Sequence, residues 1–297
     1  MRIIKMNFSF MTVSFPVDEM TFNEMIQLCD ESYAADQVHY NKILNIPSAM
    51  NYEAIGFFIL AYHDESDQLV GMASAIDLIG LNTYEWSLLV HPMFRKMGIG
   101  NTLYEVTKQS LEMRQSAGEL ALLMEKDRSF NKHFIERKGY SYSFSEVTLE
   151  TRAEFNEVPT DFLMRPFESS DTEVLLETFM LAFGDTEEEA LDLINFNTTD
   201  SRLCMWTAER NGQIVGTVTT RKEGEAQCIT AFAVHPQFER QGNGTAMLQF
   251  VKNYAASNGE KLVILDVELE NKQALSVYEK VGFSKSEQVD YYSFVGK

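Results

Sequence analysis

Two short glycine-containing stretches of this chain have the residue types and spacing of an anion-binding loop. VHPMFRKMGIG, residues 90–100, and VHPQFERQGNG, residues 234–244, share Val-His-Pro, a phenylalanine and two glycines at a spacing of 144 residues. Each follows an apolar run and precedes a segment with helical periodicity. Glycine allows close approach and positive φ, and the first turn of a helix has unpaired N–H groups. Such a loop is therefore suited to binding a phosphate.

The loop pattern does not fit two common phosphate-binding motifs. A Walker loop needs Gly-Lys-Ser or Gly-Lys-Thr, which the chain lacks. A dinucleotide-binding fingerprint needs a third glycine, and Met247 stands where that glycine would fall in the second copy. The phosphate compound therefore has to be identified from a wider pattern.

A second motif, ENKQALSVYEKVGF, follows the second loop at residues 270–283. V-x-P, an aromatic residue and R/Q-x-x-G-x-G at a strand-to-helix junction resemble the acetyl-CoA pyrophosphate loop of the GNAT superfamily of N-acetyltransferases. The downstream segment resembles that family's N-x-x-A-x-x-x-Y-x-x-x-G-F motif. The resemblance covers nearly all of both halves in the order of their elements, and it implies acetyl-CoA as co-substrate.

The resemblance also implies which residues bind acetyl-CoA. Two central parallel strands, residues 228–234 and 261–269, are expected to splay apart and admit the pantetheine arm. The implied contacts of the second half are Phe232, Ala233, Val234, Arg240, Gln241, Gly242, Asn243, Gly244, Thr245 and Asn271, and those of the first half are Leu89, Val90, Arg95, Lys96, Met97, Gly98, Ile99, Gly100 and Asn101.

The two halves differ at the residue that opens the R/Q-x-x-G-x-G pattern. Arg95 stands there in the first half, whereas the second half has Glu239, with Arg240 one place later. A carboxylate beside a phosphate is unfavourable, so Glu239 is predicted to weaken acetyl-CoA binding in the second half. The main donors are backbone N–H groups, however, and Arg240 is available as a substitute cation.

The halves differ in the opposite sense at the downstream motif. Tyr278 lies four residues before Gly282, whereas Ile135 holds the corresponding place before Gly139. By the resemblance, Tyr278 protonates the departing CoA thiolate, an effect worth about 10²–10⁴-fold in rate. From the residues alone, Tyr278 lies on an apolar stripe of i, i+3, i+4, i+7 spacing and equally fits a core position.

Other polar residues near the motifs have simpler interpretations beside the functional ones. Asn271 is implied to contact the pantetheine arm, but Asn also commonly caps helices, and Arg128 holds its place in the first half. His91 and His235, each before a proline at a strand end, are interpreted as structural. Glu85 is interpreted as an exposed edge carboxylate, and no residue of the second half stands out as the general base.

The predicted elements have the same order in both halves: strand, helix, hairpin, strand, glycine loop, helix, strand, helix, strand. Asn211-Gly212 marks the hairpin turn of the second half, and residues 151–160 form a polar linker. We therefore predict an α/β (α+β layered) protein with two GNAT-like domains, residues 1–152 and 160–297. Each is expected to have a mixed, splayed central sheet flanked by helices.

Composition narrows the class of partner. The net charge is −19 and both halves are acidic, which argues against nucleic acid. No apolar run approaches the ~18 residues of a membrane span, and the N-terminal segment, interrupted by Lys5, does not read as a signal peptide. Cys29, Cys204 and Cys228 are widely spaced, which favours a reduced, cytoplasmic setting. The histidines show no metal-ligand spacing, so no metal is expected.

These features predict a tandem acetyltransferase that moves an acetyl group from acetyl-CoA to a primary amine on a small molecule or peptide. The C-terminal half is expected to be catalytic and the N-terminal half to be degenerate in catalysis. The alternative is a non-catalytic acyl-CoA-binding or sensing module. The sequence leaves the acceptor open among a polyamine, an antibiotic, an amino acid and a protein terminus.

Overall fold

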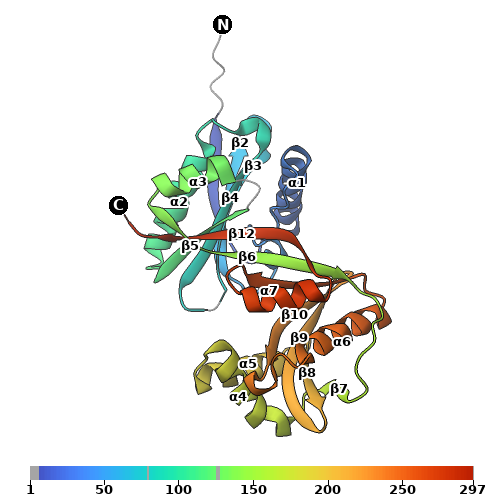
Figure 1. Ribbon diagram of the computed structural model, residues 1–297. Helices are drawn as coiled ribbons and strands as arrows, with labels where there is room; N and C mark the ends of the chain where they lie inside the picture. Colours follow the sequence, from blue (N-terminus) through green and yellow to red (C-terminus); the bar gives the residue numbers. More distant parts are fainter. Residues whose placement is uncertain (1–6, 79, 125–127, 297) are drawn as a thin grey trace. The chain divides into compact units, whose positions relative to one another are not determined.

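The computed structural model describes residues 7–78, 80–124 and 128–296, which divide into two compact units (Figure 1). Unit 1 comprises Met1–Ser145 and Val289–Lys297, and unit 2 comprises Glu146–Gln288. Each unit contains one glycine loop and one mixed sheet with apolar clusters on both faces. The layered α/β class predicted from the sequence is confirmed.

In unit 1 the strand order is β1-β2-β3-β4-β5-β12-β6, where β12 spans Ser284–Phe294, and β4 and β5 are parallel. Helices α1 and α2 pack on the sheet within separate apolar clusters. The elements are β1 (Phe8–Ser14), α1 (Glu19–Asp36), the 3-10 turn η1 (Ile46–Ser48), β2 (Ile55–His63), β3 (Gln68–Asp77), β4 (Thr83–Val90), η2 (Pro92–Phe94), α2 (Ile99–Met113), β5 (Gly118–Met124), α3 (Arg128–Arg137) and the first part of β6 (Tyr140–Arg152).

In unit 2 the order is β12-β6-β11-β10-β9-β8-β7, with β10 and β11 parallel. Helices α4 and α5 share one apolar cluster, while α6 and α7 share another on the opposite side of the strands. The elements are β7 (Phe162–Pro166), η4 (Ser169–Asp171), α4 (Thr172–Phe183), α5 (Glu187–Thr199), β8 (Leu203–Arg210), β9 (Gln213–Glu223), β10 (Ala226–Val234), η5 (Pro236–Phe238), α6 (Asn243–Ser257), β11 (Leu262–Glu268), α7 (Lys272–Lys280) and β12 (Ser284–Phe294).

Local sequence signals explain several element ends. Asn211 and Gly212 both have positive φ and form the two-residue turn predicted between β8 and β9. Gly184, at φ 81°, ends α4, and Thr186 with Glu189 forms a capping box that starts α5. Helix α5 was not predicted, although its capping box and acidic first turn are helix-start signals present in the sequence.

The two parallel strands of each unit separate partway along their length. In unit 2, residues 226–229 of β10 pair with residues 262–265 of β11, and β10 then runs on to Val234 without this partner. A bulge at Thr230 lies at the point of separation. In unit 1, residues 83–86 of β4 pair with residues 118–121 of β5 before β4 continues to Val90. The predicted splay is confirmed in both units.

The last strands of the two repeats are exchanged. Residues 289–293 of β12 pair with β5 in unit 1, and residues 146–152 of β6 pair with β11 in unit 2. The compact units therefore differ from the continuous boundaries 1–152 and 160–297 expected from the sequence. The alternating patterns of residues 140–149 and 290–295 identify strands, but they do not specify which splayed edge each strand completes.

Candidate functional site

The second glycine loop joins the free end of β10 to the start of α6. The ring of His235 accepts a hydrogen bond from the Gln237 N–H at 3.3 Å and so braces the turn η5. Arg240 and Gly242 then adopt the left-handed conformation, at φ 59° and 85°. The first i→i−4 hydrogen bond of α6 runs from the Ala246 N–H to the Gly242 carbonyl, at 3.0 Å. The N–H groups of the preceding turn are thus available to an anion.

The first glycine loop has the same backbone. His91 accepts from the Met93 N–H at 3.1 Å, and Lys96 and Gly98 are left-handed at φ 64° and 91°. Thr102 N–H bonds to the Gly98 carbonyl at 3.1 Å. Both copies of the pattern therefore build the same concave run of backbone donors, which sequence analysis expected of them.

The second glycine of each loop has a packing role. A Cβ on Gly244 would lie 3.4 Å from Phe232 Cζ, 3.5 Å from Val234 Cγ2 and 3.6 Å from Val277 Cγ1. The start of α6 therefore sits directly against β10 and α7. The loop, the end of β10 and the tyrosine helix α7 meet at this point, which brings Gly244, Phe232 and Val234 of the predicted set together.

The charged residues that open the two patterns are both engaged by other side chains. Arg95 forms an ion pair with Asp36 of α1, with Nη1 at 2.9 Å from Oδ1, and its Nε donates to the Val90 carbonyl at 3.1 Å. The Arg95 guanidinium beside Asp36 lowers the pKa of that carboxyl. Glu239 accepts from Gln273 Nε2 at 2.9 Å, which turns its carboxylate toward the start of α7.

Tyr278 combines a buried ring with a hydroxyl that has no hydrogen-bond partner among the described residues. The residue is 6% exposed, and its ring lies 5.8 Å from those of Phe232 and Phe283. Burial raises the pKa of Tyr278 to about 12, so the hydroxyl keeps its proton at neutral pH. The Tyr278 hydroxyl is not among the buried polar atoms that lack a partner, so it lies at the margin of the apolar cluster. The ring is a core residue and the hydroxyl is not, so the two interpretations of Tyr278 are compatible.

Four other residues named from the sequence lie as follows. Asn271 caps α7, its Oδ1 accepting from the Ala274 N–H at 3.0 Å, so its contact with the pantetheine arm stays a prediction. In unit 1, Ile135 is 2% exposed and carries no proton to donate. Asn101 accepts from Lys138 Nζ at 2.7 Å. Arg128 begins α3, and its side chain lies outside the described residues.

The ends of the matching strands β11 in unit 2 and β5 in unit 1 differ in polarity on the face turned away from α6 and α2, respectively. Leu265 packs in the α6 cluster, so the alternation of the strand places Asp266 and Glu268 on the opposite face. The corresponding residues of unit 1, Leu122 and Met124, are buried in the apolar cluster of α1. Two carboxylates thus lie at the end of β11, one of which, Asp266, accepts from the Thr148 hydroxyl at 2.6 Å, where β5 has two buried apolar side chains.

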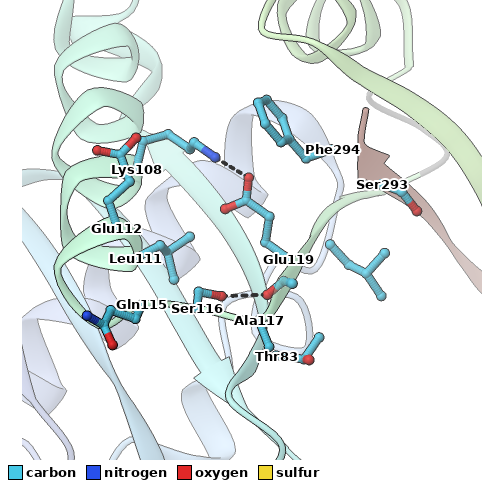
Figure 2. A pocket seen from close by; sticks show the side chains of 12 residues that line it. Thr83, Lys108, Leu111, Glu112, Gln115, Ser116, Ala117, Glu119, Ser293 and Phe294 are labelled. Atoms are coloured by element: carbon cyan, nitrogen blue, oxygen red, sulfur yellow. Dashed lines mark hydrogen bonds and ion pairs between the residues drawn. The ribbon is translucent and has the colours of Figure 1, made fainter. Parts of the chain in front are cut away.

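A pocket of about 710 Å³ lies in unit 1 at the C-terminal end of α2, the opposite end of that helix from its glycine loop (Figure 2). An ion pair between Lys108 and Glu119 crosses it, and Lys108 Nζ lies 3.9 Å from the centre of the Phe294 ring. Tyr140 also donates to Glu119 at 2.6 Å. These contacts pair Lys108 with Glu119, and the pocket is separate from the donor loop.

One residue at the second loop was missed by the sequence analysis. Arg210, at the end of β8, donates from Nη1 to the Gln241 carbonyl at 2.9 Å and to Asn243 Oδ1 at 3.1 Å. Its contacts lie more than thirty residues away in the chain, and no motif includes it. An arginine at a hairpin end carries no signal of this role in a single sequence.

Within the part of the chain that the structure describes, no group of three or more His, Cys, Asp or Glu side chains is arranged to hold a metal ion. Over the same residues, none of the helices combines the length and apolar character required to cross a membrane. The three cysteines are unpaired.

Comparison with known proteins gives an independent view of both units. The acetyltransferase (GNAT) family matches residues 22–140 and 172–283. "Probable N-acetyltransferase camello" of Xenopus tropicalis is 28% identical over 109 residues, which are 36% of this chain and 50% of that protein. "UPF0157 protein YqkA" of Bacillus subtilis (strain 168) is 35% identical over 80 residues, 27% of this chain and 23% of that protein. The matches thus span half the length or less of these curated relatives.

Two solved structures are similar over nearly the whole chain. A GCN5-related N-acetyltransferase from Sphaerobacter thermophilus has a TM-score of 0.75 at 18% identity, covering 96% of this chain and 95% of that one. A tandem GNAT protein from the clavulanic acid biosynthesis pathway has a TM-score of 0.72 at 14% identity, covering 97% and 98%. At 18% and 14% identity, these structures show similarity of fold alone. The second of them is itself a tandem GNAT protein, so the similarity of fold includes the repeat.

Proposed function

Since this chain belongs to the acetyltransferase (GNAT) family, we propose that unit 2 transfers an acetyl group from acetyl-CoA to a primary amine. The observation that carries the proposal is the placement of Tyr278. Its unpartnered hydroxyl lies on α7, beside Phe232 and next to the glycine loop, in the unit that has both a donor loop and a proton donor. The pyrophosphate of acetyl-CoA would bind the N–H groups at Gly242–Thr245, and the thioester would lie between the splayed ends of β10 and β11.

The chemistry follows from these positions. The neutral amine attacks the carbonyl carbon of the thioester, and an N–C bond forms as the C–S bond breaks. Tyr278 donates its hydroxyl proton toward the departing sulfur, and the proton lost by the amine nitrogen resupplies the phenolate through water or a base. The products are the acetylated amine and the CoA thiol.

The pKa values define what Tyr278 contributes. A thiol has a pKa of about 8.5, well below the value of about 12 to which burial raises the pKa of Tyr278. Complete proton transfer to the thiolate is therefore uphill unless the phenolate is resupplied. The hydroxyl acts first as a hydrogen-bond donor that stabilises negative charge on sulfur as it develops.

Support for an amine acceptor comes from the polar face of β11. Asp266 and Glu268 lie where unit 1 has buried Leu122 and Met124, and carboxylates favour an approaching ammonium or accept its proton. Acidic composition throughout the chain supports a cationic or neutral acceptor and is unsuited to nucleic acid. We assign no single residue as the base.

Unit 1 is proposed to bind the donor without catalysing transfer. It has the same loop backbone, but Ile135 cannot donate a proton and Arg95 is held by Asp36. The second candidate function is a non-catalytic acyl-CoA-binding or sensing module, in which both loops bind the ligand and neither unit catalyses transfer; a donor loop without a tyrosine in unit 1 favours it.

The test measures CoA release from acetyl-CoA against a panel of amines: polyamines, aminoglycosides, amino acids and peptides with free N-termini. Calorimetry with acetyl-CoA on the same protein gives the binding stoichiometry. Turnover on any amine supports the transferase. Saturable acetyl-CoA binding without turnover across the panel would favour the binding module, and no binding would contradict both.

A further inference from the structure

We propose that Arg210 is a positioning residue that fixes the second glycine loop in the conformation that receives the pyrophosphate of acetyl-CoA. The inference rests on the proposed function of unit 2 and assigns a role to a residue outside both sequence motifs. It depends on the contacts Arg210 makes to one carbonyl and one buried amide of the loop.

The contact with Gln241 controls the direction of a backbone donor. The peptide group between Gln241 and Gly242 is planar and trans, so its C=O and N–H point in opposite directions. Arg210 Nη1 holds the Gln241 carbonyl at 2.9 Å, which turns the Gly242 N–H away from Arg210. An otherwise rotatable peptide, next to a residue with φ of 85°, is thereby held in one orientation.

The contact with Asn243 extends this control to the first residue of α6. Asn243 is 1% exposed, and both polar atoms of its amide are used. Its Oδ1 accepts from Arg210 Nη1 at 3.1 Å, and its Nδ2 donates to the Phe238 carbonyl at 2.8 Å. Arg210 thus holds the start of α6 directly, and Asn243 extends the connection to the carbonyl of Phe238 in the turn η5.

Arg210 is itself anchored from outside the loop. Its Nε donates to Asp161 Oδ2 at 2.8 Å, and the hydrogen bond from Arg210 lowers the pKa of that carboxyl. Asp161 directly precedes β7, and Arg210 ends β8, so the guanidinium is held by two neighbouring strands of the sheet. A loop braced from a sheet loses less conformational entropy when it binds an anion.

Unit 1 has no equivalent of this brace. At the spacing of 144 residues, Ile99 stands in place of Asn243. The hairpin registers, in which Arg210 pairs with Gln213 and His63 with Gln68, place His63 at the position of Arg210. Ile99 is 2% exposed and packs in the apolar cluster of α2, and the ring of His63 lies 5.4 Å from that of Phe94. The same backbone is therefore supported by apolar packing in unit 1 and by a hydrogen-bonded network in unit 2.

The experiment compares Arg210→Gln and Arg210→Lys with the matched control Arg202→Gln in the full chain. Arg202 makes a similar ion pair, with Asp200, at an exposed site away from the loop. Calorimetry measures the Kd for acetyl-CoA at the site of unit 2. That site is identified as the one whose binding is lost in Gly242→Val. We expect the Kd of Arg210→Gln to rise about tenfold, that of Arg210→Lys to rise about threefold, and that of the control to stay unchanged.

Thermal unfolding of the same proteins separates positioning from a purely structural role. A lower unfolding midpoint with an unchanged Kd for acetyl-CoA would overturn the inference. If Arg210→Gln does not fold, Asp161→Asn removes only the anchor and should raise the Kd about threefold; an unchanged Kd there would also overturn it. Failure of the wild-type protein to bind acetyl-CoA would instead contradict the proposed function.

Discussion

The two glycine loops share a backbone and differ in what surrounds it. Left-handed residues occur at Lys96 and Gly98 in one and at Arg240 and Gly242 in the other. The first loop is tied to α1 by the ion pair of Arg95, whereas the second is braced by Arg210 from β8. The spacing of glycines thus specifies the loop, and side chains outside the motif specify how it is held.

The same contrast extends to the chemistry beside each loop. Unit 2 has the Tyr278 hydroxyl and the polar residues Asp266 and Glu268, whereas unit 1 has Ile135, Leu122 and Met124 at the matching positions. The three residues of unit 1 are buried and apolar, and none of them has a group that can exchange a proton. The proposal therefore assigns catalysis to unit 2 and donor binding to unit 1.

The largest effect on the difference between the two units is expected from Tyr278→Phe, through its kcat. Loss of the hydroxyl should lower kcat on the order of 10²-fold and leave the Kd for acetyl-CoA nearly unchanged, because the interaction forms mainly as the thiolate departs. Steady-state turnover and calorimetry check both values.

Tyr254→Phe is the matched control for Tyr278→Phe, since it removes a hydroxyl from α6 in the same apolar cluster. Its kcat should equal that of the wild type. The reverse change in unit 1, Ile135→Tyr, should create no activity on its own. Wild-type turnover in Tyr278→Phe would remove this residue from the mechanism.

The second prediction concerns Gly242→Val. A β-branched residue at φ 85° is strained by about 1–2 kcal/mol, so the loop should lose its donor-binding conformation. We expect acetyl-CoA affinity in unit 2 to fall at least about tenfold. Gly244→Ala is the comparison, because its Cβ would meet ordinary contacts of 3.4–3.6 Å. Equal affinities for Gly242→Val and wild type would show that the left-handed residue is not required.

The third prediction concerns pH. The folded pKa of Tyr278, about 12, lies above the unfolded value of 10, so the folded state holds this proton longer. The contribution to stability is complete below pH 10 and is lost as pH rises toward 12. The free energy of unfolding, measured with denaturant between about pH 9 and 12, should therefore fall less steeply with pH in Tyr278→Phe than in the wild type. Identical slopes would contradict the burial of the ionisable group.

The smallest expected effect is that of Glu239→Arg. Replacing the carboxylate near the proposed pyrophosphate site should tighten acetyl-CoA binding two- to threefold, about 0.5 kcal/mol, at low ionic strength. The gain should vanish above about 0.5 M salt, where exposed charges are screened. Because Glu239 bonds to Gln273, Gln273→Ala serves as the control for loss of that contact. No change at low salt would mean that the Glu239 side chain lies too far from the phosphates to matter.

Sequence patterns could predict the loops and the tyrosine motif because both are local. Positive φ at Gly98 and Gly242, and the four-residue spacing from Tyr278 to Gly282, are properties of short segments. The exchange of β6 and β12 depends on which distant edge each strand completes, and the contact of Arg210 with Gln241 joins residues far apart in the chain. Such long-range choices leave no periodic signal in a single sequence.

The central claim is that unit 2 holds acetyl-CoA with its thioester sulfur at Tyr278. A crystal structure of the protein with acetyl-CoA tests it most directly. We expect the pyrophosphate on the N–H groups of Gly242–Thr245 and the sulfur within hydrogen-bond reach of the Tyr278 hydroxyl. A donor bound in unit 2 with its sulfur on the far side of Phe232 from that hydroxyl, or a donor bound only at the loop of unit 1, would contradict it.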